Sequence, residues 1–181
     1  DAAILSYPVI TSGEYAHRDS MTALLGSEPT VEELEYMSLE KHVTAETPPC
    51  FLWQTVTDAT VPVENSYLFA EACRRNGVCF AHHVFSEGVH GMSVATEQWL
   101  EREFGVPYTL EQIRMLADAV SRGKTSYPQE KGAEILSDFG LDGKKKEKWT
   151  PGQKAAIHDT LKEVGIWPQL AEEWLNKIWK K

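Results

Sequence analysis

The sequence predicts a three-layer α/β fold, in which helices cover both faces of a parallel sheet. Residues 50–53 form an apolar run that ends in the polar turn at 57–60, as expected of a strand buried on both faces. A helix follows and stops at Gly77, and a second strand is predicted at 78–85. Strand, helix and strand within about 35 residues form the βαβ unit of a parallel sheet.

The elements around this unit extend the same pattern. Residues 2–9 are mostly apolar and end in the polar turn at 11–13, which predicts another buried strand. Trp53 is expected to pack in the core. Between the two later strands, the helix should bury one apolar face, made by Leu68, Phe69, Ala72 and Cys73.

A mixed excursion at 11–49 separates the first two strands. It holds one predicted short helix, because Thr30 and Glu33 have the spacing of a capping box. After the last strand, a short helix is predicted at 96–104, and recurrent helix signals follow at 105–150. Thr109 with Gln112 marks the start of one helix, and Gly123 marks its end. Pro128 and Gly140 mark the start and end of the next. Thr150 with Gln153 starts a third helix, which runs toward Gly165. The last helix should face the sheet through Trp167, Leu170, Ala171, Trp174, Leu175 and Ile178.

Two polar residues follow neighbouring strand ends and form the candidate site. Asp58 comes just after the strand at 50–53, and His90 lies in the loop after the strand at 78–85. Ligands and chemistry collect at the carboxyl ends of parallel strands. An acid followed by a histidine at consecutive strand ends is the second half of a Ser-Asp-His triad in α/β-hydrolase order. Histidine moves protons near neutral pH, and a carboxylate fixes its tautomer. The alternative is that Asp58 caps the helix and His90 is a loop residue.

The chain resembles the acetyl esterase/lipase-like branch of the α/β-hydrolases, which includes acetylxylan-esterase-like and feruloyl-esterase-like enzymes. The resemblance covers roughly the first hundred residues and, more weakly, the last helix, WPQLAEEWLNKI. The matching segments are DAAILSYPVI at 1–10, SLEKHVTAETPPCFLWQTVTDATVPVENSYLFAEACRRNGV at 38–78 and HVFSEGVHGMSVA at 83–95. On this resemblance, Asp58 is the triad acid and His90 is the triad histidine.

The resembling enzymes carry their serine in a G-x-S-x-G elbow, and this chain departs from that pattern. Its nearest match is Gly91-Met92-Ser93-Val94-Ala95, which lacks the strand-turn-helix setting of an elbow. Ser93 is therefore interpreted as a structural residue. We expect residues 1–181 to be the C-terminal part of a single α/β-hydrolase domain, without its N-terminal strands and nucleophile elbow. In this interpretation, 11–49 is a cap-like excursion and 105–150 is a helical insertion.

The resemblance implies a serine esterase that hydrolyses short acyl esters, acetyl esters of carbohydrates in particular. The triad serine would come from a segment outside this chain, which by itself is expected to be inactive, and the chemistry needs no cofactor. The insertion at 105–150 is expected to lie beside or over the site and to narrow which esters enter. The alternative is a helical buttress at the periphery or an oligomer contact. In this fold the excursion at 11–49 overhangs the site, so four of its residues are candidate substrate contacts, with structural roles as the alternative: His17, Arg18, Tyr36 and His42.

Two other functions remain open from the residues. One is the C-terminal part of a prolyl-oligopeptidase-like serine peptidase, which shares this end of the fold. The other is a non-catalytic α/β-hydrolase-like module with a vestigial site. An upstream reading frame that encodes G-x-S-x-G would favour the hydrolases, and an upstream propeller domain would favour the peptidase.

Composition narrows the expected partners. The formal charge of −9 and the pI near 5.2 argue against binding to nucleic acid or to an anionic membrane. The basic run at 144–148 is short and interpreted as a solvated loop. No apolar run approaches the length of a membrane span. The expected partners are a small-molecule or oligosaccharide ester and the missing N-terminal segment, and the sequence is compatible with an oligomer.

Cysteine and histidine usage gives no metal or disulfide pattern. The three cysteines, Cys50, Cys73 and Cys79, are interpreted as buried thiols. His82 and His83 are adjacent, so on a strand they point to opposite faces and cannot chelate one ion together. A cytoplasmic location is expected, although a signal peptide upstream of residue 1 would change that expectation.

Overall fold

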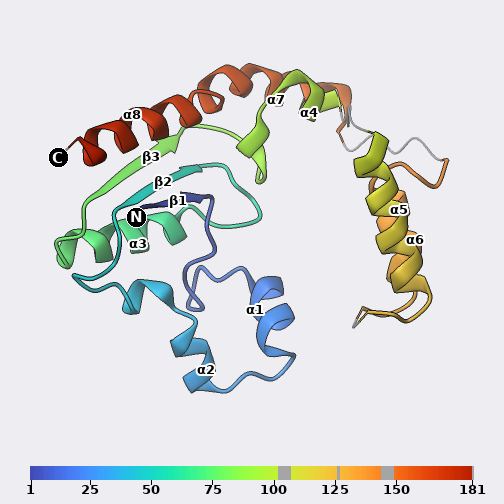
Figure 1. The fold of residues 1–181 in the computed structure, drawn as a ribbon, viewed down its shortest axis with the longest axis horizontal. Helices are drawn as coiled ribbons and strands as arrows, with labels where there is room; N and C mark the ends of the chain where they lie inside the picture. Colours follow the sequence, from blue (N-terminus) through green and yellow to red (C-terminus); the bar gives the residue numbers. More distant parts are fainter. Residues whose placement is uncertain (102–106, 126, 144–148, 181) are drawn as a thin grey trace. The chain divides into compact units, whose positions relative to one another are not determined.

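The computed structural model describes residues 1–101, 107–125, 127–143 and 149–180 (Figure 1). The chain divides into two compact units. The first comprises Asp1–Ala95 and Asp159–Lys181 and contains the sheet, whereas the second, Thr96–His158, is helical. Asp58 and His90 both belong to the first unit.

The sheet of the first unit has three parallel strands in the order β1-β2-β3, which are Ala3–Ser6, Cys50–Thr55 and Phe80–Phe85. Ala3 pairs with Cys50, and Cys50 pairs with Phe80, so the three strands run in step. All six residues of the central strand β2 are buried. The predicted βαβ unit is therefore confirmed, and the carboxyl ends of its strands lie at one edge of the sheet.

Helices cover the two faces of this sheet, which confirms the three-layer architecture (Figure 1). On one face, α3 (Glu64–Arg75) packs Phe69 and Cys73 into a core cluster that includes Leu52 of β2. On the other face, α8 (Trp167–Trp179) places Trp174 with its ring centroid 5.9 Å from that of Phe51. Phe51 and Leu52 reach opposite faces of the sheet because successive side chains of a strand point in opposite directions. The predicted stripe of α8 is confirmed, since its members are buried or half-buried.

Three burial predictions were wrong. β1 is half-buried, with Ile4 42% exposed, because β2 is its one strand neighbour among the described residues. Leu68 lies at the margin of the α3 face, where it is 36% exposed, and buried Asn65 and Ser66 take part in that face instead. Cys79 is exposed, whereas Cys50 and Cys73 are buried, and all three thiols are free.

The excursion between β1 and β2 contains more helix than predicted. It forms α1 (Arg18–Leu25), α2 (Val31–Tyr36) and the short 3₁₀ helix η1 (Leu39–Lys41). The predicted capping box at α2 is confirmed: the Glu33 backbone N–H donates to Thr30 Oγ1, and the Thr30 N–H donates to the Glu33 carboxylate. No capping signal marks the start of α1, because its N-cap residue, His17, makes no side-chain capping bond.

The two ends of this excursion meet. Leu39 N–H donates to the Ile10 carbonyl at 2.9 Å, and the hydroxyl oxygens of Ser12 and Ser38 are 2.7 Å apart. The excursion is thus a closed loop that leaves and rejoins the first unit at one place.

Asn65, at the start of α3, holds the beginning of the excursion in position. Its Oδ1 accepts from the backbone N–H groups of Ile10 and Thr11 at 2.9 and 3.0 Å. Its Nδ2 donates to the carbonyls of Tyr15 and Pro62 at 2.8 and 3.0 Å. Asn65 is fully buried, and its Oδ1 satisfies two backbone N–H groups in buried hydrogen bonds.

The helical unit contains the elements predicted after His90. They are α4 (Glu97–Glu101), α5 (Pro107–Ser121), α6 (Lys131–Asp138) and the first part of α7 (Pro151–Val164). Gly123 and Gly140 follow α5 and α6 with φ of 66° and 65°, which confirms both as stops. The predicted residues 102–104 and the basic run at 144–148 lie outside the described residues. The role of 105–150 as an insertion, and its position beside the site, stay predictions.

In the part of the chain that the structure describes, no helix is both long enough and apolar enough to cross a membrane.

Candidate active site

Asp58 lies in the turn that follows β2 and is held there by the backbone. Its Oδ1 accepts hydrogen bonds from the N–H groups of Thr60 and Val61, at 2.9 and 3.0 Å. The side chain is 1% exposed. An aspartate that bonds backbone groups two and three residues ahead forms a local turn, which explains why the chain turns here. The second carboxylate oxygen, Oδ2, is directed elsewhere.

That second oxygen meets His90. The distance between His90 Nδ1 and Asp58 Oδ2 is 2.8 Å, within the 2.6–3.2 Å that a hydrogen bond requires, so the predicted contact is confirmed. Because a carboxylate accepts, Nδ1 carries the proton, and Nε2 is left as the ring nitrogen that can take one. The His90 side chain is 30% exposed, so it lies at the surface of the site rather than in the core. The catalytic roles of the two residues stay predictions.

The loop that carries His90 is fastened to the end of β2 through Gly88. The hydroxyls of Thr55 and Thr57 each donate to the Gly88 carbonyl at 3.0 Å, and the Gly88 N–H lies 2.9 Å from Thr57 Oγ1. Gly88 has φ of 152°, and a Cβ there would lie 2.6 Å from Thr55 Cγ2 and 3.0 Å from Met92 Sδ. Glycine is therefore required for the loop to approach β2 this closely.

Ser93 occupies the short 3₁₀ helix η2 (Met92–Val94), not a strand-turn-helix elbow. Its Oγ accepts a hydrogen bond from the Tyr7 hydroxyl at 2.6 Å, and its carbonyl accepts one from the Trp167 indole N–H at 3.1 Å. Both contacts agree with the interpretation of Ser93 as a structural residue.

Tyr7 is a member of the site that the sequence prediction missed. Its ring centroid lies 4.6 Å from that of His90, with the two planes at 65°. The available signal was its position: Tyr7 directly follows β1, at the same edge of the sheet as the loops of Asp58 and His90.

The four candidate contacts of the excursion make local interactions. His17 Nδ1 lies 2.8 Å from Ser20 Oγ, and His42 Nε2 lies 2.8 Å from the Tyr36 carbonyl oxygen. The Arg18 guanidinium donates to the carbonyls of Ser12 and Gly13. Contact of these residues with a substrate stays a prediction.

The adjacent histidines of β3 serve the two faces of the sheet, as predicted. His82 Nε2 lies 3.0 Å from Ser66 Oγ on α3, whereas the His83 ring stacks on Phe51 at 5.1 Å. Burial lowers the pKa of both imidazoles, and the nearby His83 adds to the effect at His82. Across the described residues, no three His, Cys, Asp or Glu side chains form a group that could hold a metal ion.

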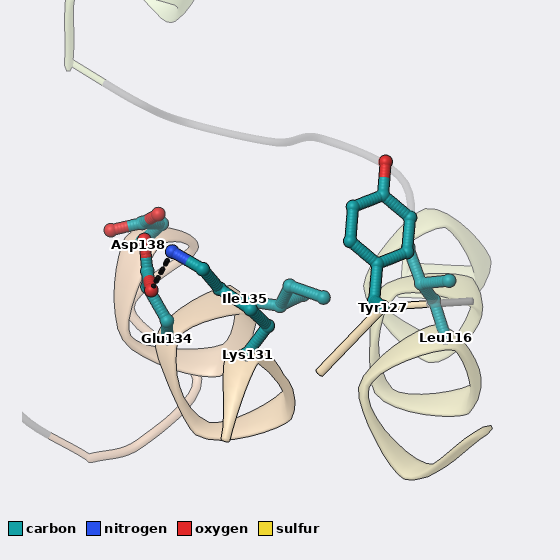
Figure 2. Close-up of a pocket in the computed structure, with 6 residues that line it drawn as sticks. All are labelled: Leu116, Tyr127, Lys131, Glu134, Ile135 and Asp138. Atoms are coloured by element: carbon teal, nitrogen blue, oxygen red, sulfur yellow. Dashed lines mark hydrogen bonds and ion pairs between the residues drawn. The ribbon is translucent and has the colours of Figure 1, made fainter. Parts of the chain in front are cut away.

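The helical unit has a pocket of its own, of about 240 Å³, between α5 and α6 (Figure 2). Figure 2 shows the Leu116, Ile135 and Tyr127 side chains on its walls and the Lys131–Glu134 ion pair, 2.6 Å long, at its rim. Asp138 completes the lining.

Residues 2–112, more than half of the chain, match the prolyl oligopeptidase family. The chain belongs to the prolyl oligopeptidase family. The matched range contains all three strands as well as Asp58 and His90. Together with the parallel sheet and its two helical layers, this membership confirms the predicted α/β-hydrolase fold.

Two proteins similar to this member of the family are a xylanase and a bifunctional hydrolase. It is 56% identical over 120 residues to endo-1,4-beta-xylanase B of Butyrivibrio fibrisolvens, covering 66% of this chain and 19% of that protein. It is 43% identical, with a TM-score of 0.53, to the acetyl ester-xyloside bifunctional hydrolase of Caldicellulosiruptor lactoaceticus. That likeness covers 57% of this chain and 38% of the solved chain. This member of the family thus spans less than half of either relative.

Proposed function

We propose that the protein containing this chain is a serine esterase that removes short acyl groups, acetyl groups in particular, from carbohydrates. The observation that carries the proposal is the hydrogen bond of 2.8 Å between Asp58 and His90, formed by loops that follow neighbouring parallel strands. A buried carboxylate with a half-exposed imidazole is the arrangement that a serine hydrolase needs for proton transfer.

In the proposed mechanism, His90 Nε2 takes the proton from a serine hydroxyl as the serine oxygen attacks the ester carbonyl carbon. The bond between this carbon and the alcohol oxygen then breaks, and His90 returns the proton to the departing alcohol. Water, activated by the same nitrogen, releases the acid and restores the serine. Asp58 keeps the proton of the neutral ring on Nδ1 and stabilises the imidazolium that forms in each step. The serine and the oxyanion donors would come from a segment outside these 181 residues.

The substrate class rests on the two relatives. One is named a xylanase and the other an acetyl ester-xyloside bifunctional hydrolase, a name that pairs an acetyl ester with a xyloside. An acetylated xylo-oligosaccharide would satisfy both. The proposed partners are therefore such an oligosaccharide ester and the segment that carries the serine.

A serine peptidase is the second candidate, and the family match is the observation that favours it. Proline-directed peptide hydrolysis would use the same two residues in the same roles, because amides and esters pass through similar tetrahedral intermediates. The two candidates therefore differ in substrate and not in the chemistry of the Asp58–His90 pair.

The test compares three substrates with the protein expressed at its full natural length: an acetylated xylo-oligosaccharide, p-nitrophenyl acetate and a proline-containing peptide. We expect hydrolysis of the two esters at a kcat/KM well above that of the peptide, and loss of about 10³-fold or more in kcat for His90→Ala. His158→Ala, at a histidine whose side chain is 52% exposed on α7, is the matched control and should keep full activity. Preference for the peptide would establish the second candidate. Full ester hydrolysis by His90→Ala would exclude both.

A further inference from the structure

Tyr7 has an unusual backbone conformation. Its φ is 39°, and it is the one non-glycine residue with positive φ in the described ranges. Side chains other than glycine rarely adopt this region, and the proline that follows restricts Tyr7 further. A residue stays in such a conformation when its surroundings hold it there, and these residues gather at functional sites. The Tyr7 N–H donates to the Trp53 carbonyl at 2.8 Å, which fixes the turn to the central strand.

The Tyr7 ring lies between the core and the imidazole of His90. On one side its edge contacts Trp53, at 5.1 Å between centroids and 87° between planes. Trp53 is fully buried, and its indole N–H donates to Ser6 Oγ at 2.8 Å, so it forms a rigid support. On the other side lies His90, at 4.6 Å. Aromatic pairs with this edge-on geometry are favourable beyond their buried area.

The Tyr7 hydroxyl fixes the same loop at a second point. It donates to Ser93 Oγ at 2.6 Å, three residues after His90. Ser93 is held in turn by the indole N–H of Trp167, whose ring stacks on Trp53 at 5.3 Å and 18°. Tyr7, Ser93, Trp167 and Trp53 thus form a closed ring of contacts around the base of the His90 loop.

We propose that Tyr7 is a positioning residue for His90, a role that rests on the proposed function. The Asp58 hydrogen bond fixes one nitrogen but leaves the imidazole free to tilt through its side-chain torsions. Contact with the Tyr7 ring removes that freedom and keeps Nε2 directed toward the serine. Small errors in the placement of a catalytic group slow the chemical step far more than they weaken substrate binding.

The test uses the full-length protein and measures kcat and KM for p-nitrophenyl acetate, with active sites counted by the acyl-enzyme burst. Tyr7→Leu should lower kcat roughly tenfold to a hundredfold and leave KM within about twofold. Tyr7→Phe keeps the ring and should recover most of the loss.

The double variant Tyr7→Phe/Ser93→Ala tests the hydroxyl contact. It should be no slower than the slower single variant, because both single variants remove the same hydrogen bond. The matched control is Tyr67→Leu, since the Tyr67 ring stands edge-on to His82 at 5.7 Å. It should match the wild type.

Three outcomes would overturn the role. The first is a wild-type kcat for Tyr7→Leu while His90→Ala is inactive. This result would exclude the positioning role of Tyr7 and leave the proposed function intact. The second is equal loss in Tyr7→Phe and Tyr7→Leu, since the ring would then be irrelevant. If Tyr7→Leu does not fold, Tyr7→Met takes its place, and the third outcome is a wild-type kcat for that variant or additive losses in Tyr7→Phe and Ser93→Ala. Full activity of His90→Ala would remove the proposed function and Tyr7's role together.

Discussion

His90 Nδ1 lies 2.8 Å from Asp58 Oδ2, while Oδ1 of the same carboxylate is bonded by the backbone of Thr60 and Val61. The carboxylate therefore cannot rotate toward solvent without losing two backbone hydrogen bonds. The turn that ends β2 therefore fixes the position of His90 Nδ1. Four predictions concern the site and the elements around it.

Asp58→Asn should preserve the fold and remove activity. The amide oxygen can still accept from Thr60 and Val61, but the NH₂ group would then face His90 Nδ1 as a donor. Nδ1 must become an acceptor, which moves the proton to Nε2 and prevents it from receiving one from the serine. We expect kcat to fall by about 10⁴-fold in the full-length protein, with an unchanged melting temperature.

The control for this change is Asp19→Asn, at an exposed aspartate in the first turn of α1. It removes the same charge and should keep wild-type kcat. A loss of less than about tenfold in Asp58→Asn would contradict the assigned role of the carboxylate.

Gly88→Ala should disturb the site by displacing the His90 loop. The new methyl group would lie 2.6 Å from Thr55 Cγ2, which belongs to the fully buried strand β2 and cannot yield easily. We expect a decrease of about 1–3 kcal/mol in the free energy of unfolding together with a lower kcat. Urea denaturation and steady-state kinetics on the same preparation measure both effects.

Gly26→Ala separates steric overlap from backbone strain. Gly26 has φ of 90°, yet nothing lies within 4 Å of its added Cβ. The Gly26→Ala variant should have a lower free energy of unfolding through backbone strain alone, and its kcat should be unchanged. Equal kcat in Gly88→Ala and the wild type would show that the loop adapts without moving His90.

Asn65→Ala should be among the most destabilising single changes in the first unit. It leaves the buried N–H groups of Ile10 and Thr11 without their partner and removes the donor to the Tyr15 carbonyl, whereas the Pro62 carbonyl keeps the backbone N–H of residue 65. Each unsatisfied buried group costs about 1–3 kcal/mol, so we expect a total loss of about 3 kcal/mol or more. The measurement is the free energy of unfolding in urea.

Asn76→Ala is the comparison, because Asn76 is exposed and donates one hydrogen bond, to the Ala72 carbonyl. The decrease in the free energy of unfolding of Asn76→Ala should stay below about 1 kcal/mol. If the two variants were equally stable, the amide of Asn65 would not hold the excursion.

Stability should fall on acidification through the histidines of β3. Burial lowers the pKa of His82 and of His83 in the folded protein, whereas both return to about 6.5 on unfolding. Below about pH 6.5 the unfolded chain therefore binds more protons than the folded one, and the free energy of unfolding decreases until the folded pKa values are passed.

The variant His82→Gln should weaken this dependence. The glutamine amide can still reach Ser66 but does not titrate, so the difference in urea midpoint between pH 7.5 and pH 5.5 should be smaller than in the wild type. His42→Gln, at an exposed histidine outside the sheet, should retain the wild-type difference. An unchanged difference in His82→Gln would show that its burial does not affect the acid response.

Local signals account for the parts of the fold that the sequence predicted. The apolar run at β2, the glycine stops of α3, α5 and α6, and the capping box of Thr30 each act within a few residues of the chain. The approach of Asp58 to His90 was also predictable, because consecutive parallel strands bring their following loops to one edge of the sheet.

Contacts between distant segments were not predictable in this way. Tyr7 meets His90 across 83 positions although β1 and β3 lie on opposite sides of β2, a neighbour order that periodicity does not encode. Asn65 resembles an ordinary polar residue of a helix start until Ile10 and Thr11 are seen beside it. The exposure of Cys79 likewise depends on where the turn before β3 places it and not on its residue type.

The closed excursion between β1 and β2 has a consequence for how such proteins diversify. Ser12 contacts Ser38, and Asn65 binds the backbone of Ile10 and Thr11. The segment from 13 to 37 is therefore attached to the rest of the unit through one fixed stem, formed by these contacts. Replacement of that segment, even with one of a different length, would leave the stem closed and the strands undisturbed. Evolution, or an engineer grafting segments from relatives, can therefore exchange this part of the molecule as a cassette while Asp58 and His90 stay where they are.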